Sequence, residues 1–135
     1  KRGESVGFAC DQHMPPPRGI VSTFLGQPAA TTPAPARFAL ESDAPIIIAH
    51  TYRDPESPWL HHLHFEEFSI ERGDRSQNDI IEHNTHRIND ILSDLVLKHP
   101  EQWLWHHRRF KVSERLSDYE RPNDNAESAA SSRRI

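Results

Sequence analysis

The sequence contains a single cysteine among its 135 residues, so no disulfide can form within the chain. It has no run approaching the ~20 apolar residues that a membrane-spanning helix requires, and no signal peptide is visible. The net charge of −4, with histidine neutral, provides no overall positive field, which argues against nucleic acid as a partner. With 35% hydrophobic and 27% charged residues, the composition is that of an ordinary globular domain with one modest core.

Four segments have the apolar runs or the alternation that predict β-strands. They are Ser5–Cys10, Ile20–Leu25, Pro45–Tyr52 and Trp59–Ile70. The isoleucine run of the third segment is typical of a strand that is buried on both faces. In the fourth segment the apolar positions change phase at Glu66-Glu67, which predicts a β-bulge at that point.

Two segments have helical signals. Thr32 stands in an N-cap position before a proline, for a helix that ends near Glu41 and turns Phe38 inward. Residues 76–98 predict the longest helix, because Ser76 and Asp79 resemble a capping box and one face is apolar. That face comprises Ile81, Ile88, Ile91, Leu92, Leu95 and Val96. Together the elements predict an α/β fold, a mixed sheet with packed helices, followed over residues 113–135 by a disordered polar tail.

The most distinctive stretch is His99–Lys111, which combines two Trp, three His and three basic residues directly after the long helix. Large flat apolar side chains beside cations suit the headgroup level of a membrane or an anionic lipid surface. The same composition also suits a packed anchor that closes the domain. The candidate membrane-facing residues are Trp103, Trp105, Arg108 and Arg109.

Three polar residues stand at the ends of predicted strands or beside stiff backbone. Asp11 ends the first predicted strand, where a carboxylate can serve a ligand at the sheet edge or simply close a turn. Arg18 lies between three prolines and Gly19, which suits a fixed phosphate- or carboxylate-binding guanidinium, and a solvated arginine explains the pattern equally well. Arg53 follows the Pro45–Tyr52 strand, so that parallel strands would place it at the same sheet edge as Asp11.

These residues and the closing block together resemble the lipid A biosynthesis acyltransferases, within the broader lysophospholipid acyltransferase family. In that family an Asp-Gln pair ends a strand, Arg-Gly and Phe-x-Gly follow, and a turn with Thr and Pro opens a helix. The matching residues here are Asp11-Gln12, Arg18-Gly19, Phe24-Leu25-Gly26 and Thr31-Thr32-Pro33. A Pro-Glu-Gln-Trp-Leu-Trp-x-His-Arg-Arg-x-Lys block closes the family's domain, and Pro100–Lys111 is similar to it. The order and approximate spacing agree over about residues 5–111.

The resemblance implies an enzyme that transfers a fatty acyl chain from an acyl carrier protein thioester to a hydroxyl of a lipid A precursor. It implies work at the cytoplasmic face of the bacterial inner membrane, peripheral or anchored through an N-terminal part, and it implies no cofactor. Residues 1–112 would form the C-terminal part of the acyltransferase domain, with substrate-binding roles for Asp11, Gln12, Arg18 and Arg53. Two alternatives stay open: another glycolipid acceptor, such as a phosphatidylinositol mannoside, and a non-catalytic membrane- or protein-binding module.

The histidines invite a catalytic and a metal interpretation. The family's catalytic His, with an acid five positions later, lies upstream of the Asp-Gln pair, and this chain is expected to lack it. His61 with Glu66 and His62 with Glu67 fit that spacing, but residues five apart on a strand face opposite sides, so both matches are attributed to chance. His61, His62 and His64 cannot all share one face of a strand, and no cysteine or acid stands at a recognised zinc spacing, so no metal site is predicted.

Overall fold

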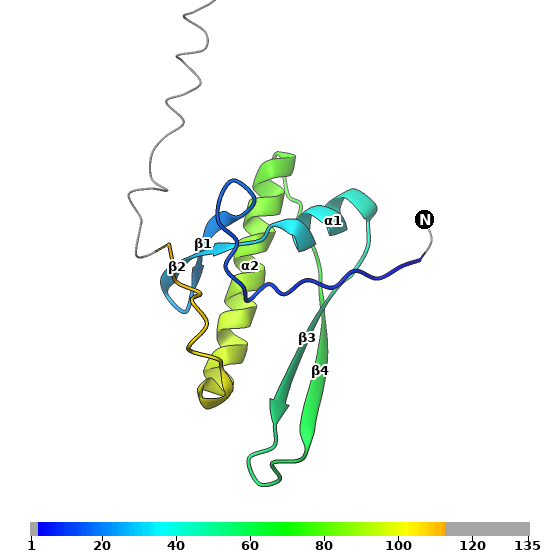
Figure 1. Ribbon diagram of the computed structural model, residues 1–135. Coiled ribbons are helices and arrows are strands. Elements are labelled where there is room, and N and C mark those ends of the chain that lie inside the picture. The colour runs from blue at the N-terminus through cyan, green and yellow to red at the C-terminus, as the bar shows by residue number, and fades with distance from the viewer. Residues whose placement is uncertain (1–2, 113–135) are drawn as a thin grey trace, which may run out of the picture.

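The computed structural model describes residues 3–112, so the predicted polar tail lies outside the described residues. In chain order the elements are β1 (Ile20–Phe24), β2 (Gln27–Thr31), α1 (Ala34–Ser42), β3 (Ile46–Arg53), β4 (His61–Phe68), α2 (Gln77–Lys98) and the 3₁₀ turn η1 (Pro100–Gln102). The strands form two separate antiparallel pairs, β1 with β2 and β3 with β4. In Figure 1, α2 stands between the two hairpins and α1 lies beside its upper half.

The predicted α/β class is confirmed, but the strands do not join in one mixed sheet. Ser5–Cys10 forms no strand, and Val6 and Phe8 are exposed. A strand needs a neighbour for its backbone groups, and the apolar pattern of this segment could not reveal whether one is present. Asp11 therefore does not end a strand, and the prediction that Asp11 and Arg53 share a sheet edge is wrong.

The β1–β2 hairpin confirms the strand predicted over Ile20–Leu25, which ends at Phe24. Phe24 is paired with Gln27, so the turn consists of Leu25 and Gly26 alone. Both have positive φ, 49° and 74°, as the tightest hairpin turns require. Glycine adopts this conformation without strain, whereas Leu25 is held in it by its N–H, which donates to the Ser93 hydroxyl at 3.0 Å.

The β3–β4 hairpin pairs in continuous register from end to end. The bulge predicted at Glu66-Glu67 is therefore wrong, because each of these residues faces one partner on β3. Burial of β3 on both faces is also wrong, since Ile48 is 8% exposed but its neighbour Ile47 is 53% exposed. Leu63 and Phe65 lie on the same outer face and are exposed, and this exposure explains the phase change in the sequence.

Helix α2 begins and ends where the sequence predicts. The Ser76 hydroxyl accepts a hydrogen bond from the Asp79 N–H at 3.3 Å and donates one to its carboxylate at 2.7 Å. Pro100 follows the last residue of the helix by two positions and prevents its continuation. At α1 the N-cap is Pro33 and not Thr32 as predicted, although the Thr32 hydroxyl accepts from the Ala34 N–H at 3.3 Å. Phe38 is 53% exposed and not inward as predicted.

Two apolar clusters attach the hairpins to α2. Phe24 and Ala29 of the first hairpin pack with Val96, and Ile48 and Phe68 of the second pack with Ile88. The predicted apolar face of α2 thus contacts both hairpins. Buried polar residues interrupt this face, namely Asn84, Thr85 and Asn89. Within residues 3–112, no helix is both long and apolar enough to cross a membrane.

Candidate functional site

Arg109 joins four segments of the chain from a fully buried position. Its guanidinium donates to two backbone carbonyls and two side-chain oxygens, those of Gln12 (3.2 Å), Ala30 (2.6 Å), Thr31 (2.6 Å) and Asn89 (3.3 Å). It also lies 5.1 Å from the centre of the Phe24 ring. Burial lowers the pKa of Arg109, but an arginine side chain remains charged in a protein. The prediction that Arg109 faces a membrane is therefore wrong.

The Asp11-Gln12 segment is held by its backbone, while its side chains remain accessible. Arg109 binds the Gln12 carbonyl, and two residues later the Met14 N–H donates to the Ala30 carbonyl at 3.1 Å. Asp11 is half-buried and Gln12 is exposed. This arrangement can present a carboxylate and an amide to a polar ligand from a fixed backbone.

Two titratable groups flank this pair, and both are neutral at pH 7. Burial raises the pKa of the Cys10 thiol to about 11, so almost no thiolate is present to act as a nucleophile. Burial lowers the pKa of His13, and the positive charges of Lys111 and Arg109 lower it further. The buried Nδ1 of His13 has no hydrogen-bond partner in the described structure. His13 was not singled out from the sequence, because no acid stands at the family's spacing from it.

Arg18 is exposed beside a glycine that the fold requires. The Gly19 N–H donates to the Pro15 carbonyl at 3.0 Å. A side-chain carbon on Gly19 would lie 1.7 Å from the Met14 carbonyl oxygen, which leaves no room for any other residue. The absence of a side chain at this position lets the loop close tightly and sets the place of Arg18.

Arg53 lies beside η1 because the Gln102 side chain binds its backbone. The Arg53 N–H donates to Gln102 Oε1 at 2.7 Å, and Gln102 Nε2 donates to the Arg53 carbonyl at 2.9 Å. The Gln102 side-chain amide thus makes the same pair of hydrogen bonds with Arg53 that a residue of a neighbouring strand would make. The Arg53 side chain is exposed, and its position is set by η1 and not by Asp11.

The closing block divides into an inward and an outward half. Inward, the ring centres of Trp103 and Phe110 lie 5.5 and 6.0 Å from that of Phe24, and Arg109 between them in the sequence is fully buried. We define the outward half as Leu104, Trp105 and Arg108, all of which are exposed. The Trp105 indole N–H donates to the Pro100 carbonyl at 2.7 Å, so this ring is oriented although 54% exposed.

The β4 histidines form a ring stack with the neighbouring strand. Tyr52 lies 4.8 Å from His62, 5.4 Å from His64 and 4.1 Å from His99 between ring centres. His62 Nε2 is 2.9 Å from the Asp54 carboxylate, an acid that precedes it by eight positions. Between residues 3 and 112, no three His, Cys, Asp or Glu side chains are grouped to hold a metal ion.

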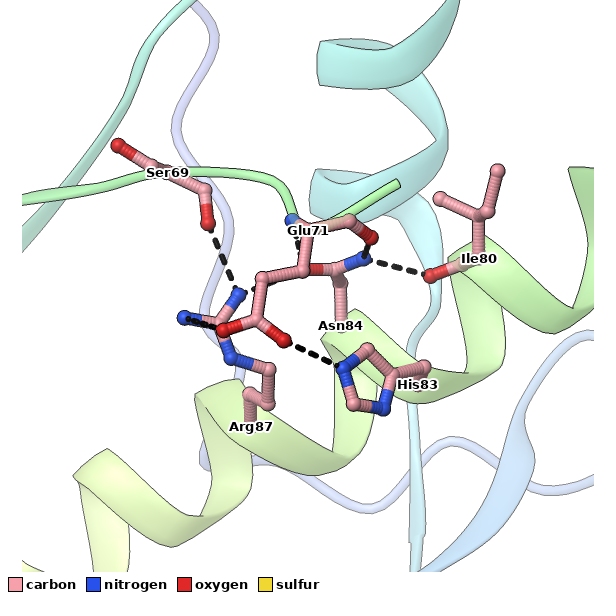
Figure 2. Close-up of polar contacts among 6 residues, drawn as sticks. All are labelled: Ser69, Glu71, Ile80, His83, Asn84 and Arg87. Carbon is pink, nitrogen blue, oxygen red and sulfur yellow. Dashed lines mark hydrogen bonds and ion pairs between the residues drawn. The ribbon is translucent and has the colours of Figure 1, made fainter. Parts of the chain in front are cut away.

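Figure 2 shows a second histidine–carboxylate pair that sequence spacing could not reveal. His83 Nε2 lies 2.8 Å from one Glu71 oxygen, and Arg87 lies 3.1 Å from the other. The hydrogen bond from His83 lowers the pKa of Glu71, which favours its ionised form. The Asn84 side-chain amide accepts a hydrogen bond from the Glu71 N–H and donates one to the Glu71 carbonyl, and Arg87 donates to the Ser69 carbonyl. These contacts fasten the segment after β4 to α2.

The turn after β3 should respond to acid through Asp54. Hydrogen bonds from His62 and from the Ser57 and Glu56 N–H groups lower the pKa of this carboxylate, so it stabilises the turn when ionised. That contribution is present above the ordinary pKa of aspartate and is lost as the pH falls through the lowered value. We expect the Ser57 and Glu56 amide NMR signals to move with a midpoint below that of a free aspartate. Asp54→Asn should abolish the transition, and a midpoint above the ordinary value would contradict this assignment.

Comparison with known families identifies the class of this protein. The sequence profile of the bacterial lipid A biosynthesis acyltransferases matches residues 1–112. The match covers most of the chain, so the chain belongs to this family, and the resemblance found in its motifs is confirmed. The two hairpins and two helices are compatible with part of an acyltransferase domain. No curated protein and no solved structure matches the chain.

Proposed function

We propose that this chain forms the acceptor-binding part of an acyltransferase that transfers a fatty acyl chain from an acyl carrier protein thioester to a hydroxyl of a lipid A precursor. Family membership supports acyl transfer. The proposal that this part of the enzyme binds the acceptor rests on the hydrogen-bond network of the Arg109 guanidinium. It fixes the Asp11-Gln12 segment and Thr31, two of the motifs that resemble the family, against α2 through Asn89.

The accessible side chains around this network match the groups of a phosphorylated glycolipid. The Asp11 carboxylate can accept hydrogen bonds from sugar hydroxyls, and the Gln12 amide can donate or accept. The Arg18 guanidinium can bind a phosphate oxygen pair from a loop whose closure Gly19 permits. Arg53 would contact an anionic group from the end of the second hairpin.

The reaction needs a base that takes the proton of the acceptor hydroxyl as its oxygen attacks the thioester carbonyl. The carrier's thiol then leaves with a proton. We propose that the chain does not supply this base, because no histidine between residues 3 and 112 contacts an acid five positions later. The carboxylates that contact His62 and His83 precede them by eight and twelve positions. A positioned base contributes on the order of 10²–10⁴ in rate, so the chain alone should bind substrates with little turnover.

An acyl-transfer assay tests this proposal. The chain is incubated with acyl–acyl carrier protein and a lipid A precursor in detergent micelles, and the products are measured by mass spectrometry. We expect acceptor binding without an acylated product. If the unaltered chain forms the acylated product and His13→Gln does not, His13 is the base, and the proposal that the chain lacks the base is contradicted. A chain that binds neither substrate, or that prefers a phosphatidylinositol mannoside, would contradict the proposed acceptor.

Arg108 should contribute to binding at an anionic bilayer. It belongs to the exposed outward half of the closing block, and a basic residue near such a surface is worth about 1 kcal/mol. Arg108→Ala should therefore weaken binding to phosphatidylglycerol-containing vesicles by roughly fivefold, with thermal stability nearly unchanged. Vesicle co-sedimentation and thermal unfolding measure the two effects. Unchanged vesicle binding together with lost stability would show that Arg108 is part of a packed anchor that closes the domain.

A further inference from the structure

The loop that joins β3 to β4 exposes a tryptophan at its tip. Trp59 is 94% exposed, more than any other large hydrophobic side chain between residues 3 and 112, and Leu60 beside it is 51% exposed. No packing contact of the described domain explains so large an apolar side chain in this position. A soluble surface rarely presents such residues together unless they bind something.

This loop pairs the backbone N–H groups of Asp54, Glu56, Ser57 and Leu60 internally. Asp54 Oδ1 accepts hydrogen bonds from the Glu56 and Ser57 N–H groups at 2.9 and 2.8 Å. The Leu60 N–H donates to the Ser57 carbonyl, and the Leu60 carbonyl accepts from the Asp54 N–H, both at 2.8 Å. Paired N–H groups cost little to move out of water, so these hydrogen bonds lower the cost of bringing Trp59 into a less polar medium.

The tip and Trp105, a member of the outward half of the closing block, lie at the same end of the molecule. Gln102 binds the backbone of Arg53, the residue that directly precedes the loop. The Trp105 ring is bonded to Pro100, which opens the same short turn as Gln102. In Figure 1 the β3–β4 loop and η1 both lie towards the lower end of the domain.

We propose that Trp59 and Leu60 form a lipid-inserting tip that enters the headgroup–acyl boundary of a bilayer, with Trp105 as a second contact. This inference rests on the membrane-binding part of the proposed function. Tryptophan suits that boundary because its ring is apolar and its N–H remains able to bond with headgroups. Glu56 in the loop opposes attraction to anionic lipid. The tip therefore acts by apolar partition, whereas Arg108 acts by charge.

Vesicles that carry brominated acyl chains test the tip directly, because bromine quenches only tryptophans that reach the acyl region. We compare the full chain with Trp59→Phe, Trp59→Ser and the matched control Ile47→Ser, which removes an exposed apolar residue from the other end of the hairpin. Trp59→Phe should keep vesicle binding and lose most of the quenching. Trp59→Ser should weaken binding by about tenfold on neutral and anionic vesicles alike, and Ile47→Ser should change neither.

Quenching that survives unchanged in Trp59→Phe would overturn the proposal, as would undiminished vesicle binding by Trp59→Ser. Self-association of the full chain that disappears in Trp59→Ser, measured without lipid by sedimentation velocity, would identify the tip as a protein interface and also overturn it. Acceptor binding in detergent micelles needs no bilayer. If the unaltered chain is not quenched by the brominated vesicles but still binds the acceptor in micelles, the tip alone is refuted. If the unaltered chain is quenched but binds no acceptor in micelles, the proposed acceptor alone is refuted.

Discussion

Arg109→Met is expected to lower the free energy of unfolding by about 3–5 kcal/mol, because several buried acceptors lose their donor and each such group costs about 1–3 kcal/mol. Methionine fills a similar volume but offers no donors. The Ala30 carbonyl and the Thr31 and Asn89 side chains would then stay buried without the hydrogen bonds that Arg109 supplies. Urea unfolding followed by tryptophan fluorescence measures the loss, because Trp103 packs beside the same Phe24 ring.

The neighbouring Arg108→Met provides the matched control. Arg108 is exposed, so its replacement should change the stability by no more than about 0.5 kcal/mol. If Arg109→Met fails to fold, Thr31→Val removes a single acceptor of the network and should cost about 1–2 kcal/mol. Equal stabilities for Arg109→Met and Arg108→Met would contradict the stabilising role of the Arg109 hydrogen bonds.

Gly19→Ala is the second substitution expected to have a large effect, of about 3 kcal/mol, at the upper end of the cost of overpacking. The added carbon would lie 1.7 Å from the Met14 carbonyl oxygen and 3.1 Å from that of Thr31. Both obstacles are backbone atoms, so no side chain can rotate away, and the loop must open. The hydrogen bonds of Met14 with Ala30 and of Gly19 with Pro15 would be weakened with it.

Gly7→Ala is the control for this prediction, because a side-chain carbon there meets nothing within 4 Å. Its thermal unfolding midpoint should match that of the unaltered chain, while Gly19→Ala should unfold several degrees lower. Gly19→Ala should also weaken acceptor binding, because Arg18 moves with the loop. A Gly19→Ala variant as stable as Gly7→Ala would show that the loop is not closed in solution.

The features that the sequence predicted well are those determined by neighbouring residues. The cap at Ser76, the end of α2 at Lys98 and the strand that ends at Phe24 each depend on residues within a few positions. Family membership was also accessible, because the Asp-Gln, Arg-Gly and closing motifs keep their order along the chain. Caps and turns can be predicted because the types of neighbouring residues determine them.

The errors concern contacts between distant parts of the chain. Ser5–Cys10 has a strand-like pattern, but no neighbouring strand pairs with it in the described structure. Arg109 was assigned to a membrane surface from the composition of the closing block. Its hydrogen-bond partners lie 20 to 97 positions away in the sequence, and composition does not reveal such contacts. One signal was available in Asn89, a polar residue within the apolar face of α2 that needs a buried partner.

Vesicle co-sedimentation with and without the acceptor tests the central claim most directly, that this chain binds a lipid A precursor through the segments held by Arg109. Two vesicle preparations of equal surface charge are compared, one of which contains the precursor. The chain should bind the precursor-containing vesicles more tightly, and Arg18→Ala should remove that preference without altering binding to the other vesicles. Equal binding of the unaltered chain to both preparations would contradict the claim.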